Sequence, residues 1–217
     1  KEIAMRRGHK REEDVTIVRS GPNISKLKVG PAKPEVKNGF KYLVGYIGVM
    51  GKQEGIDLLL QSVDYLVHKK NRTDIRFCIM GGGPALDELR EMNAKMGLTD
   101  YVEFPGRVSD EFLADVLNTA DVCVNPDLPS EMNDKSTMNK IMEYMAFGKP
   151  IVQFTLKEGK FSAQEASLYA KNTDTDDFAE KILWLLENPE KAAEMGRFGR
   201  ERVVNELSWD YEKPKLI

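Results

Sequence analysis

Short apolar runs alternate with amphipathic stretches along this chain from about residue 40 onward. Two of the apolar runs, Lys41–Ile47 (KYLVGYI) and Ile75–Met80 (IRFCIM), are rich in β-branched and aromatic residues, which is typical of buried strands. The stretch Glu54–Lys70 repeats apolar residues every three or four positions, as one face of a helix does. The same patterns predict further strands at Tyr101–Phe104, Asp121–Asn125, Ile151–Phe154 and Ser167–Ala170, and further helices at Ala85–Met96, Asp110–Thr119, Thr137–Phe147, Asp176–Glu187 and Pro189–Glu206.

This alternation of strands with longer helices determines the expected fold class. Such strands pair in parallel through right-handed crossovers, with helices on both faces of the sheet. We therefore predict an α/β protein with a doubly wound parallel sheet. Ligands of such sheets bind beyond the carboxyl ends of the strands, so the loops at those ends are the first candidates for a site.

The first part of the chain differs in composition. Asp14–Arg19 (DVTIVR) is predicted to be a short strand, and Ile24–Lys41 is polar with several Gly and Pro residues, as linkers are. We expect residues 1–39 to be the end of a preceding domain with a linker, and residues 40–217 to be the main domain.

Both ends of the chain run into predicted elements. Lys1–Arg7 has a helical pattern, and Trp209 begins a new segment that soon stops. We interpret the chain as a fragment of a longer enzyme.

Composition and charge exclude several classes of function. The chain has 217 residues, of which 41% are hydrophobic and 31% charged, as in ordinary globular proteins. Its net charge of −3 argues against a general nucleic-acid or membrane-surface binder. No apolar run approaches the roughly 18 residues of a membrane span, and no signal-peptide pattern is visible. Cys78 and Cys123 lie in apolar runs and are expected to be buried thiols, which favours a cytoplasmic protein. His9 and His68 lie among charged residues and are expected to be solvated.

Two glycine-rich loops follow predicted strands. The first includes Gly48, Gly51 and Lys52, and glycines with a lysine suit a phosphate. It matches neither the Walker nor the Rossmann glycine spacing, and a plain turn is the alternative. The second, Gly81, Gly82 and Gly83 before Pro84, has more glycines than a turn needs, which indicates either a turn or a pocket wall.

The segment Asn133–Pro150 is the strongest candidate. Lys140, Glu143, Tyr144 and Phe147 are spaced to share one helix face. A carboxylate near the start of a helix can hold a ribose diol while the free amides bind phosphate. The alternative is an ordinary intrahelical pair between Lys140 and Glu143.

The run EYMAFGKPIV (143–152) resembles the glutamate-containing signature of family 4 glycosyltransferases, enzymes of the GT-B fold. The pieces GIDLLL, IMGGGP, VEFPGRV, ADVCVNP and MGRFGRERV are also similar, in the right order, over about Phe40–Asp210. The resemblance implies the Rossmann-like, nucleotide-sugar-binding half of a sugar transferase.

The resemblance also implies roles for particular residues. Glu143 would bind the ribose hydroxyls, the backbone of Met138 and Asn139 would meet the diphosphate, and Arg107 with Val108 would contact the base. Gly81, Gly82 and Gly83 would line the same cleft, and Gly48 and Gly51 of the first glycine loop are also expected to bind substrate.

Several positions depart from the family pattern. The first glutamate of the family's E-x7-E motif falls on Lys135, and the usual diphosphate-binding cations fall on Val49 and Glu54. Lys52 and Lys140 are the expected replacements, both pointing into one cleft. They are our catalytic candidates, although Lys52 could instead be solvated.

No metal or other cofactor is expected, because the resemblance is to GT-B enzymes, which generally need none. Asp174, Asp176 and Asp177 resemble the metal motif of the other glycosyltransferase fold, but a helix-capping role explains them.

The expected function is a retaining glycosyltransferase that uses a nucleotide-diphosphate sugar, of UDP or GDP type. The acceptor, a sugar or lipid-linked sugar, would bind largely to a preceding domain, and peripheral membrane association is expected, if at all, only for the full-length enzyme. No nucleic-acid partner is expected. The alternatives are a non-catalytic nucleotide-binding domain and a sugar-nucleotide 2-epimerase.

Overall fold

A six-stranded sheet, parallel at every pairing, forms the centre of the computed structural model, which describes residues 1–216. The strand order is β3-β2-β1-β4-β5-β6, as in doubly wound nucleotide-binding sheets, so the predicted fold class is confirmed. The strands are β1 (Tyr42–Ile47), β2 (Ile75–Met80), β3 (Val102–Gly106), β4 (Val122–Asn125), β5 (Ile151–Phe154) and β6 (Ser167–Ala170).

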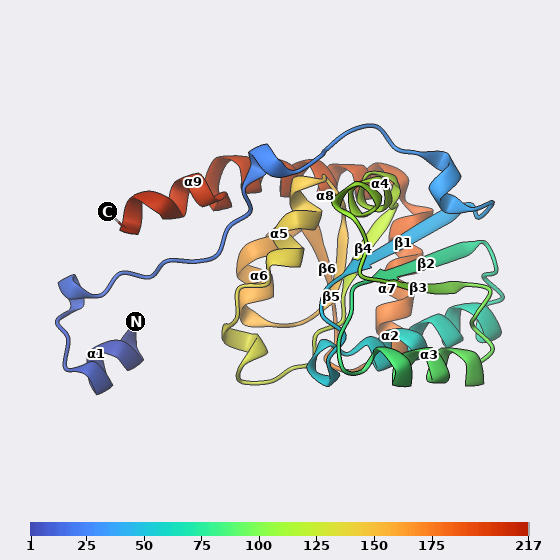
Figure 1. The fold of residues 1–217 in the computed structure, drawn as a ribbon, viewed down its shortest axis with the longest axis horizontal. Helices are drawn as coiled ribbons and strands as arrows, with labels where there is room; N and C mark the ends of the chain where they lie inside the picture. The colour runs from blue at the N-terminus through green and yellow to red at the C-terminus, as the bar shows by residue number, and fades with distance from the viewer. Residues whose placement is uncertain (217) are drawn as a thin grey trace.

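Helices cover both faces of this sheet (Figure 1). One face packs on α2 (Ile56–Asp64), α3 (Leu86–Lys95) and α7 (Thr175–Glu187), and the other packs on α4 (Asp110–Thr119), α5 (Asn139–Ala146) and α6 (Lys157–Ala163). The remaining helices are α8 (Pro189–Arg202), which packs against α5 and α7, and the short α1 (Glu2–Gly8) and α9 (Trp209–Glu212) near the two ends.

Alternate residues of β1 supply two separate hydrophobic cores. Val44 and Tyr46 belong to the core under α2, whereas Leu43 belongs to the core under α5, because successive side chains of a strand point to opposite faces. Cys78 and Cys123 are buried as free thiols, and burial raises the pKa of each to about 12.

Two predicted helix caps are present. The side chain of Ser109 accepts a hydrogen bond from the backbone N–H of Phe112 at 3.2 Å, and that of Asp174 accepts one from Asp177 at 2.9 Å. The capping interpretation of Asp174 is therefore confirmed.

The predicted strand at Asp14–Arg19 is wrong. Glu12–Asp14 form a 3-10 turn, and residues 15–19 belong to no helix or strand. β-Branched residues favour a strand only where a sheet edge can pair with it. The backbone N–H of Arg19 instead donates to the carboxylate of Glu212 at 2.9 Å.

The polar stretch predicted to be a linker is docked along α4. The N–H of Gly30 donates to Asn118 and that of Lys33 donates to Thr119, each at 2.9 Å. Lys33 also pairs with Asp115 at 2.8 Å. Hydrogen bonds and an ion pair therefore hold this stretch against α4.

The helix α6 was not expected from the pattern, because its sequence KEGKFSA has no apolar stripe. Its last carbonyl groups are held by Arg202, which donates to the backbone oxygens of Phe161 and Ser162 at 3.1 Å each.

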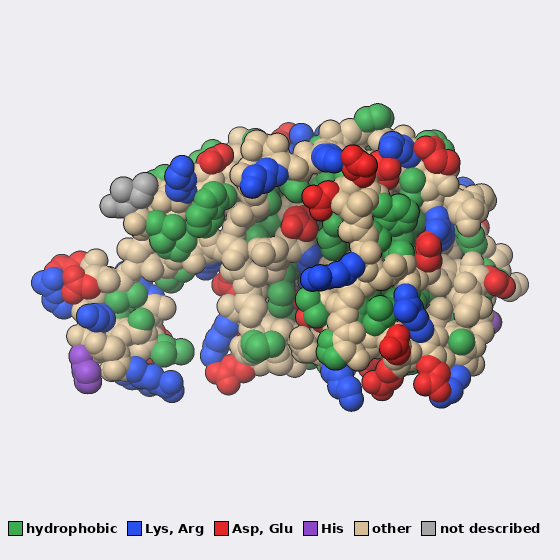
Figure 2. All heavy atoms as spheres, in the orientation of Figure 1, with side chains coloured by type: hydrophobic (Ala, Val, Ile, Leu, Met, Phe, Trp, Pro, Cys, Tyr) green, Lys and Arg blue, Asp and Glu red, His purple; other side chains and the backbone are tan. Residues whose placement is uncertain are grey.

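Residues 1–14 form a protrusion at the side of the sheet domain in Figure 1. On the face drawn in Figure 2, basic and acidic side chains are interspersed. Among residues 1–216, no helix has both the length and the apolar content needed to cross a membrane.

Candidate functional site

The crevice of this sheet lies between β1 and β4, where the strand order reverses. The loop that follows β1 at Gly48, the loop that follows β4 at Pro126, and the start of α5 at Asn139 all lie at this carboxyl edge. The predicted site segments are therefore brought to one place.

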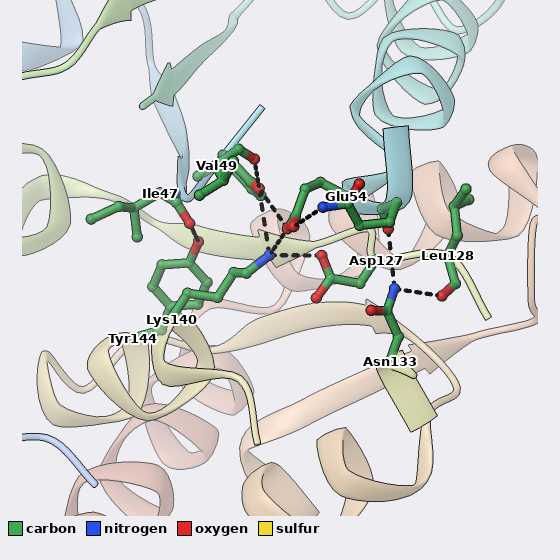
Figure 3. Close-up of polar contacts among 10 residues, drawn as sticks. Ile47, Val49, Glu54, Asp127, Leu128, Asn133, Lys140 and Tyr144 are labelled. Atoms are coloured by element: carbon green, nitrogen blue, oxygen red, sulfur yellow. Dashed lines mark hydrogen bonds and ion pairs between the residues drawn. The ribbon is translucent and has the colours of Figure 1, made fainter. Parts of the chain in front are cut away.

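A buried charge cluster joins these segments (Figure 3). The ammonium nitrogen of Lys140 lies 2.7 Å from Oε2 of Glu54 and 2.6 Å from Oδ1 of Asp127. The side chains of Lys140, Glu54 and Asp127 are 10%, 16% and 1% exposed. The hydroxyl of Tyr46 lies 3.4 Å from the same nitrogen and donates to the carbonyl of Val49 at 3.2 Å.

The cluster holds one cation and two carboxyl groups. Burial opposes the charge of Lys140, but Tyr46, Asp127 and Glu54 outweigh it, and its pKa is raised. Burial also opposes the charge of Glu54, but Lys140 outweighs it, so that pKa is lowered. For Asp127 burial exceeds the effect of Lys140 and raises the pKa to about 7. Lys140 and Glu54 are therefore charged at neutral pH, whereas Asp127 gains a proton as the pH falls through about 7.

Glu143 lies one helical turn after Lys140 but in different surroundings. It lines a cavity of about 230 Å³ together with Ile47, Leu113 and Phe147. Burial raises the pKa of its carboxyl group, and that group has no hydrogen-bond partner among residues 1–216. The alternative pair between Lys140 and Glu143 is wrong, because the lysine reaches Glu54 and Asp127 instead.

Tyr144 fixes α5 against the end of β1. Its hydroxyl oxygen accepts a hydrogen bond from the backbone N–H of Ile47 at 2.9 Å, and the residue is fully buried. The expected shared face of α5 thus has two parts. Lys140 and Tyr144 contact the β1 end, and Glu143 and Phe147 line the adjoining cavity.

Close backbone packing explains two of the three glycines after β2. A Cβ atom at Gly83 would lie 2.5 Å from the carbonyl oxygen of Met50, and one at Gly81 would lie even closer to the loop after β1. The backbone that approaches these glycines is therefore that of the Gly48–Gly51 loop. At Gly82 the nearest atom would be Cγ of Arg107, at 3.5 Å.

Lys52 is not brought together with Lys140. It is exposed in the 3-10 turn Lys52–Glu54 and lines a cavity of about 290 Å³ with Asp57 and Glu88, between α2 and α3. The expectation that both lysines point into one cleft is therefore wrong, because the turn directs Lys52 outward and Lys140 is buried.

The other predicted residues lie around the same edge. Met138 and Asn139 form the cap and first residue of α5, and Arg107 is exposed just after β3. Lys135 points away, since it is exposed and pairs with Glu131 at 2.5 Å.

The sequence interpretation missed Asp127 and the acidic role of Glu54. A usable signal was present for Asp127, because an acidic residue directly after a buried strand lies at the ligand-binding edge. Glu54 was noted only as a departure from a family pattern.

Comparison with known proteins identifies the family. The family model for glycosyl transferases group 1 matches residues 41–188. The chain belongs to this family. Among curated members of similar sequence, the D-rhamnosyltransferase WbpZ of Pseudomonas aeruginosa is 29% identical over 160 residues, which cover 72% of this chain and 39% of that protein.

A second relative is the GDP-mannose-dependent monoacylated α-(1-6)-phosphatidylinositol monomannoside mannosyltransferase of Corynebacterium glutamicum. It is 24% identical over 198 residues, covering 86% of this chain and 51% of the relative. The chain thus spans about half or less of the length of these relatives.

The fold is also that of solved glycosyltransferases. The crystal structure of a mutant of S. aureus TarM in complex with fondaparinux, α-GlcNAc-glycerol and UDP superposes with a TM-score of 0.74 at 23% identity. The match covers 96% of this chain and 40% of the other.

Proposed function

We propose that this chain is the donor-binding part of a retaining family 4 glycosyltransferase of the GT-B fold, which transfers a sugar from a nucleotide diphosphate to an acceptor. Membership of glycosyl transferases group 1 supports sugar transfer. The TarM complex contains UDP, and the Corynebacterium relative is named for GDP-mannose, so a donor of UDP or GDP type is proposed.

The observation that carries the proposal is the carboxyl group of Glu143. It is half-buried, has no hydrogen-bond partner in residues 1–216, and lines a cavity at the switch point of a doubly wound sheet. A carboxylate so placed is suited to accept two hydrogen bonds from a ribose diol. Removing that carboxylate from water is costly unless such donors are supplied.

The start of α5 supports the same assignment. The backbone N–H groups around Met138 and Asn139 are among those that a helix leaves unpaired at its first turn, and such groups favour phosphate. We propose that they contact the diphosphate, that Arg107 and Val108 contact the base, and that Gly48, Gly51 and the Gly81–Gly83 turn form the wall.

Cations assist departure of the diphosphate by stabilising the negative charge that develops as the glycosidic bond breaks. Lys140 is at the correct edge, but its charge is balanced by Glu54 and Asp127. We propose that a diphosphate competes with these carboxylates for Lys140. Lys52 is exposed on the α2–α3 side, and we propose that its flexible side chain reorients to meet the bound diphosphate. Neither contact requires a metal ion.

The remaining parts of the proposal concern the whole enzyme. Residues 1–39 are proposed to connect this domain to a preceding one that binds the acceptor, a sugar or lipid-linked sugar, in the cytoplasm. Any peripheral contact with a membrane would belong to that longer enzyme.

A non-catalytic nucleotide-binding domain is the second candidate, favoured by the outward orientation of Lys135. A 2-epimerase would need a histidine near the donor sugar. His68 instead lies near the C-terminal end of α2, hydrogen-bonded to the carbonyl of Met96 at 3.1 Å.

Titration calorimetry of the chain with UDP, GDP and their sugars tests the proposal. We expect saturable binding of one nucleotide series, unchanged by EDTA. Lys52→Met should weaken the diphosphate more than the matching nucleoside, since only the former carries the charge. If no nucleoside diphosphate binds the folded chain at millimolar concentration, the donor-site assignment is wrong. If donor binds but an enzyme carrying both domains does not release nucleotide with any acceptor, the non-catalytic alternative holds.

A further inference from the structure

Arg19 connects the first part of the chain to the beginning of α6. Its guanidinium donates to the carboxylate of Glu158 at 3.2 and 3.4 Å, and it lies 4.3 Å from the ring centre of Phe161. The Arg19 and Glu158 side chains are 29% and 20% exposed. A bidentate pair of this kind, partly out of water and close to an aromatic ring, is stronger than a single exposed ion pair.

The same end of α6 holds the loop that leads into α5. Oε2 of Glu158 accepts from the hydroxyl of Thr137 at 3.4 Å. The backbone N–H of Lys157 donates to Asp134 at 2.9 Å, and its ammonium lies 3.0 Å from the same carboxylate. Lys157 and Glu158, which are consecutive in α6, thus contact Asp134 and Thr137 of this loop.

Thr137 directly precedes Met138, the cap residue of α5. The position of Thr137 therefore sets the direction in which the first N–H groups of α5 point. Arg19 orients Glu158, and Glu158 contacts Thr137, so a residue far away in the sequence reaches the start of the candidate diphosphate-binding helix.

We propose that Arg19 is a positioning residue for the donor site, which acts through Glu158 on the turn at Thr137 and Met138. This inference rests on the proposed function of α5. Without the guanidinium, Glu158 would lose its cation and turn toward water, and the start of α5 would sample more orientations.

The backbone around Arg19 is anchored independently of its side chain. The N–H of Arg19 bonds to Glu212, the N–H of Trp209 donates to the carbonyl of Pro22 at 3.1 Å, and a Cβ atom at Gly21 would lie 2.6 Å from the carbonyl oxygen of Leu207. A substitution of the Arg19 side chain therefore leaves the segment docked.

The first test is a double-mutant cycle. Arg19→Met and Thr137→Val should each weaken binding of the nucleoside diphosphate roughly threefold to tenfold, the range for members of one hydrogen-bond network. The double variant should lose little more than either single variant. Arg19→Lys, which keeps the charge but not the bidentate geometry, should fall between wild type and Arg19→Met. Lys215→Met is the matched control, since Lys215 pairs with Glu212 at the same junction, at 2.7 Å, without reaching Glu158.

Amide hydrogen exchange of the free chain gives a second readout that does not depend on a ligand. Exchange at residues 134–140 should accelerate in Arg19→Met and stay at the wild-type rate in Lys215→Met. Additive losses of affinity in the cycle, or unchanged affinity and exchange in folded Arg19→Met, would overturn the proposal. If wild type binds no nucleoside diphosphate while the exchange difference is present, the positioning role stands and the donor-site assignment fails.

Discussion

The backbone of Gly81 passes the carbonyl oxygen of Gly48 so closely that a Cβ atom at Gly81 would lie 1.8 Å from it. The N–H of Gly48 also donates to the carbonyl of Met80 at 3.1 Å. The loops after β1 and β2 are therefore packed as one unit. Their close contact requires glycine, because a side chain at Gly81 would occupy the space of the Gly48 backbone.

This contact predicts that Gly81→Ala is strongly destabilising. Gly81 has φ +137°, a conformation that residues with a Cβ rarely adopt, and the new methyl group would overlap backbone that cannot turn away. We expect a loss of about 2 kcal/mol or more in the free energy of unfolding, measured with urea. Gly82→Ala is the matched control, with its nearest atom at 3.5 Å, and should cost less than about 1 kcal/mol. Equal losses at the two positions would contradict the close-contact explanation.

Lys140→Met should also destabilise the fold. It leaves Glu54 and Asp127 buried without their cation, and removal of one member of a buried ion pair typically costs about 3–5 kcal/mol. Adding Glu54→Gln to Lys140→Met should recover part of the loss, because Glu54, whose pKa Lys140 lowers, is then no longer left charged without its cation. Lys95→Met, which breaks an exposed pair with Glu91, should change stability by less than about 1 kcal/mol. A double variant no more stable than Lys140→Met would show that the cluster is not electrostatically coupled.

The raised pKa of Asp127 predicts how stability depends on pH. The carboxyl group binds its proton more tightly in the folded chain, with a pKa of about 7, than in the unfolded chain, where it is about 3.9. Its contribution is therefore fully present below about pH 4 and is lost as the pH rises toward 7. Asp127→Asn should have a flatter profile of melting temperature between pH 5 and 7.5 than wild type. Asp100→Asn, at an exposed turn, is the control, and a wild-type slope in Asp127→Asn would refute the assignment of this titration.

Glu143→Gln should weaken nucleotide binding without unfolding the chain. An amide replaces one acceptor oxygen by a donor, and hydrogen bonds to a charged group are worth about 1.5–3 kcal/mol, so affinity should fall at least about tenfold. Calorimetry with the preferred nucleoside diphosphate measures this, with Glu165→Gln at an exposed position as the control. Unchanged affinity in the folded variant would remove Glu143 from the site.

Truncation distinguishes a flexible linker from the docked segment seen here. A chain beginning at Phe40 loses Ile24, Leu27 and Val36, which pack against the core under α5. It should be less stable by at least about 2 kcal/mol. A chain beginning at Arg19 keeps these contacts and should unfold near the wild-type urea midpoint. Equal stability of the two shortened chains would mean that the docked segment contributes nothing.

The strands could be predicted from sequence because their signal is local. Ile75–Met80, Ile151–Phe154 and Ser167–Ala170 have the bounds that their apolar runs indicate, since a strand covered on both faces must be apolar almost throughout. Asp14–Arg19 has the same local signal but no neighbour to pair with. Whether such a run forms a strand depends on a neighbouring strand that the tertiary structure supplies. The six residues of the run do not contain that information.

The charge cluster could not be predicted for a related reason. Glu54 and Asp127 become neighbours of Lys140 only because β1 pairs with β4 across a reversal in strand order. Helical spacing correctly placed Lys140 and Glu143 one turn apart, yet it could not show that their side chains enter different surroundings.

The central position of β1 has a consequence for how the chain must be made. Val44 pairs with Phe77 on one side and with Val122 on the other. At usual rates of translation, the second partner leaves the ribosome roughly 2–9 s after the first. For that interval the central strand β1 has one edge unpaired, open to chaperones and to other nascent chains. Raising the level of chaperones during expression should therefore improve the yield of soluble protein.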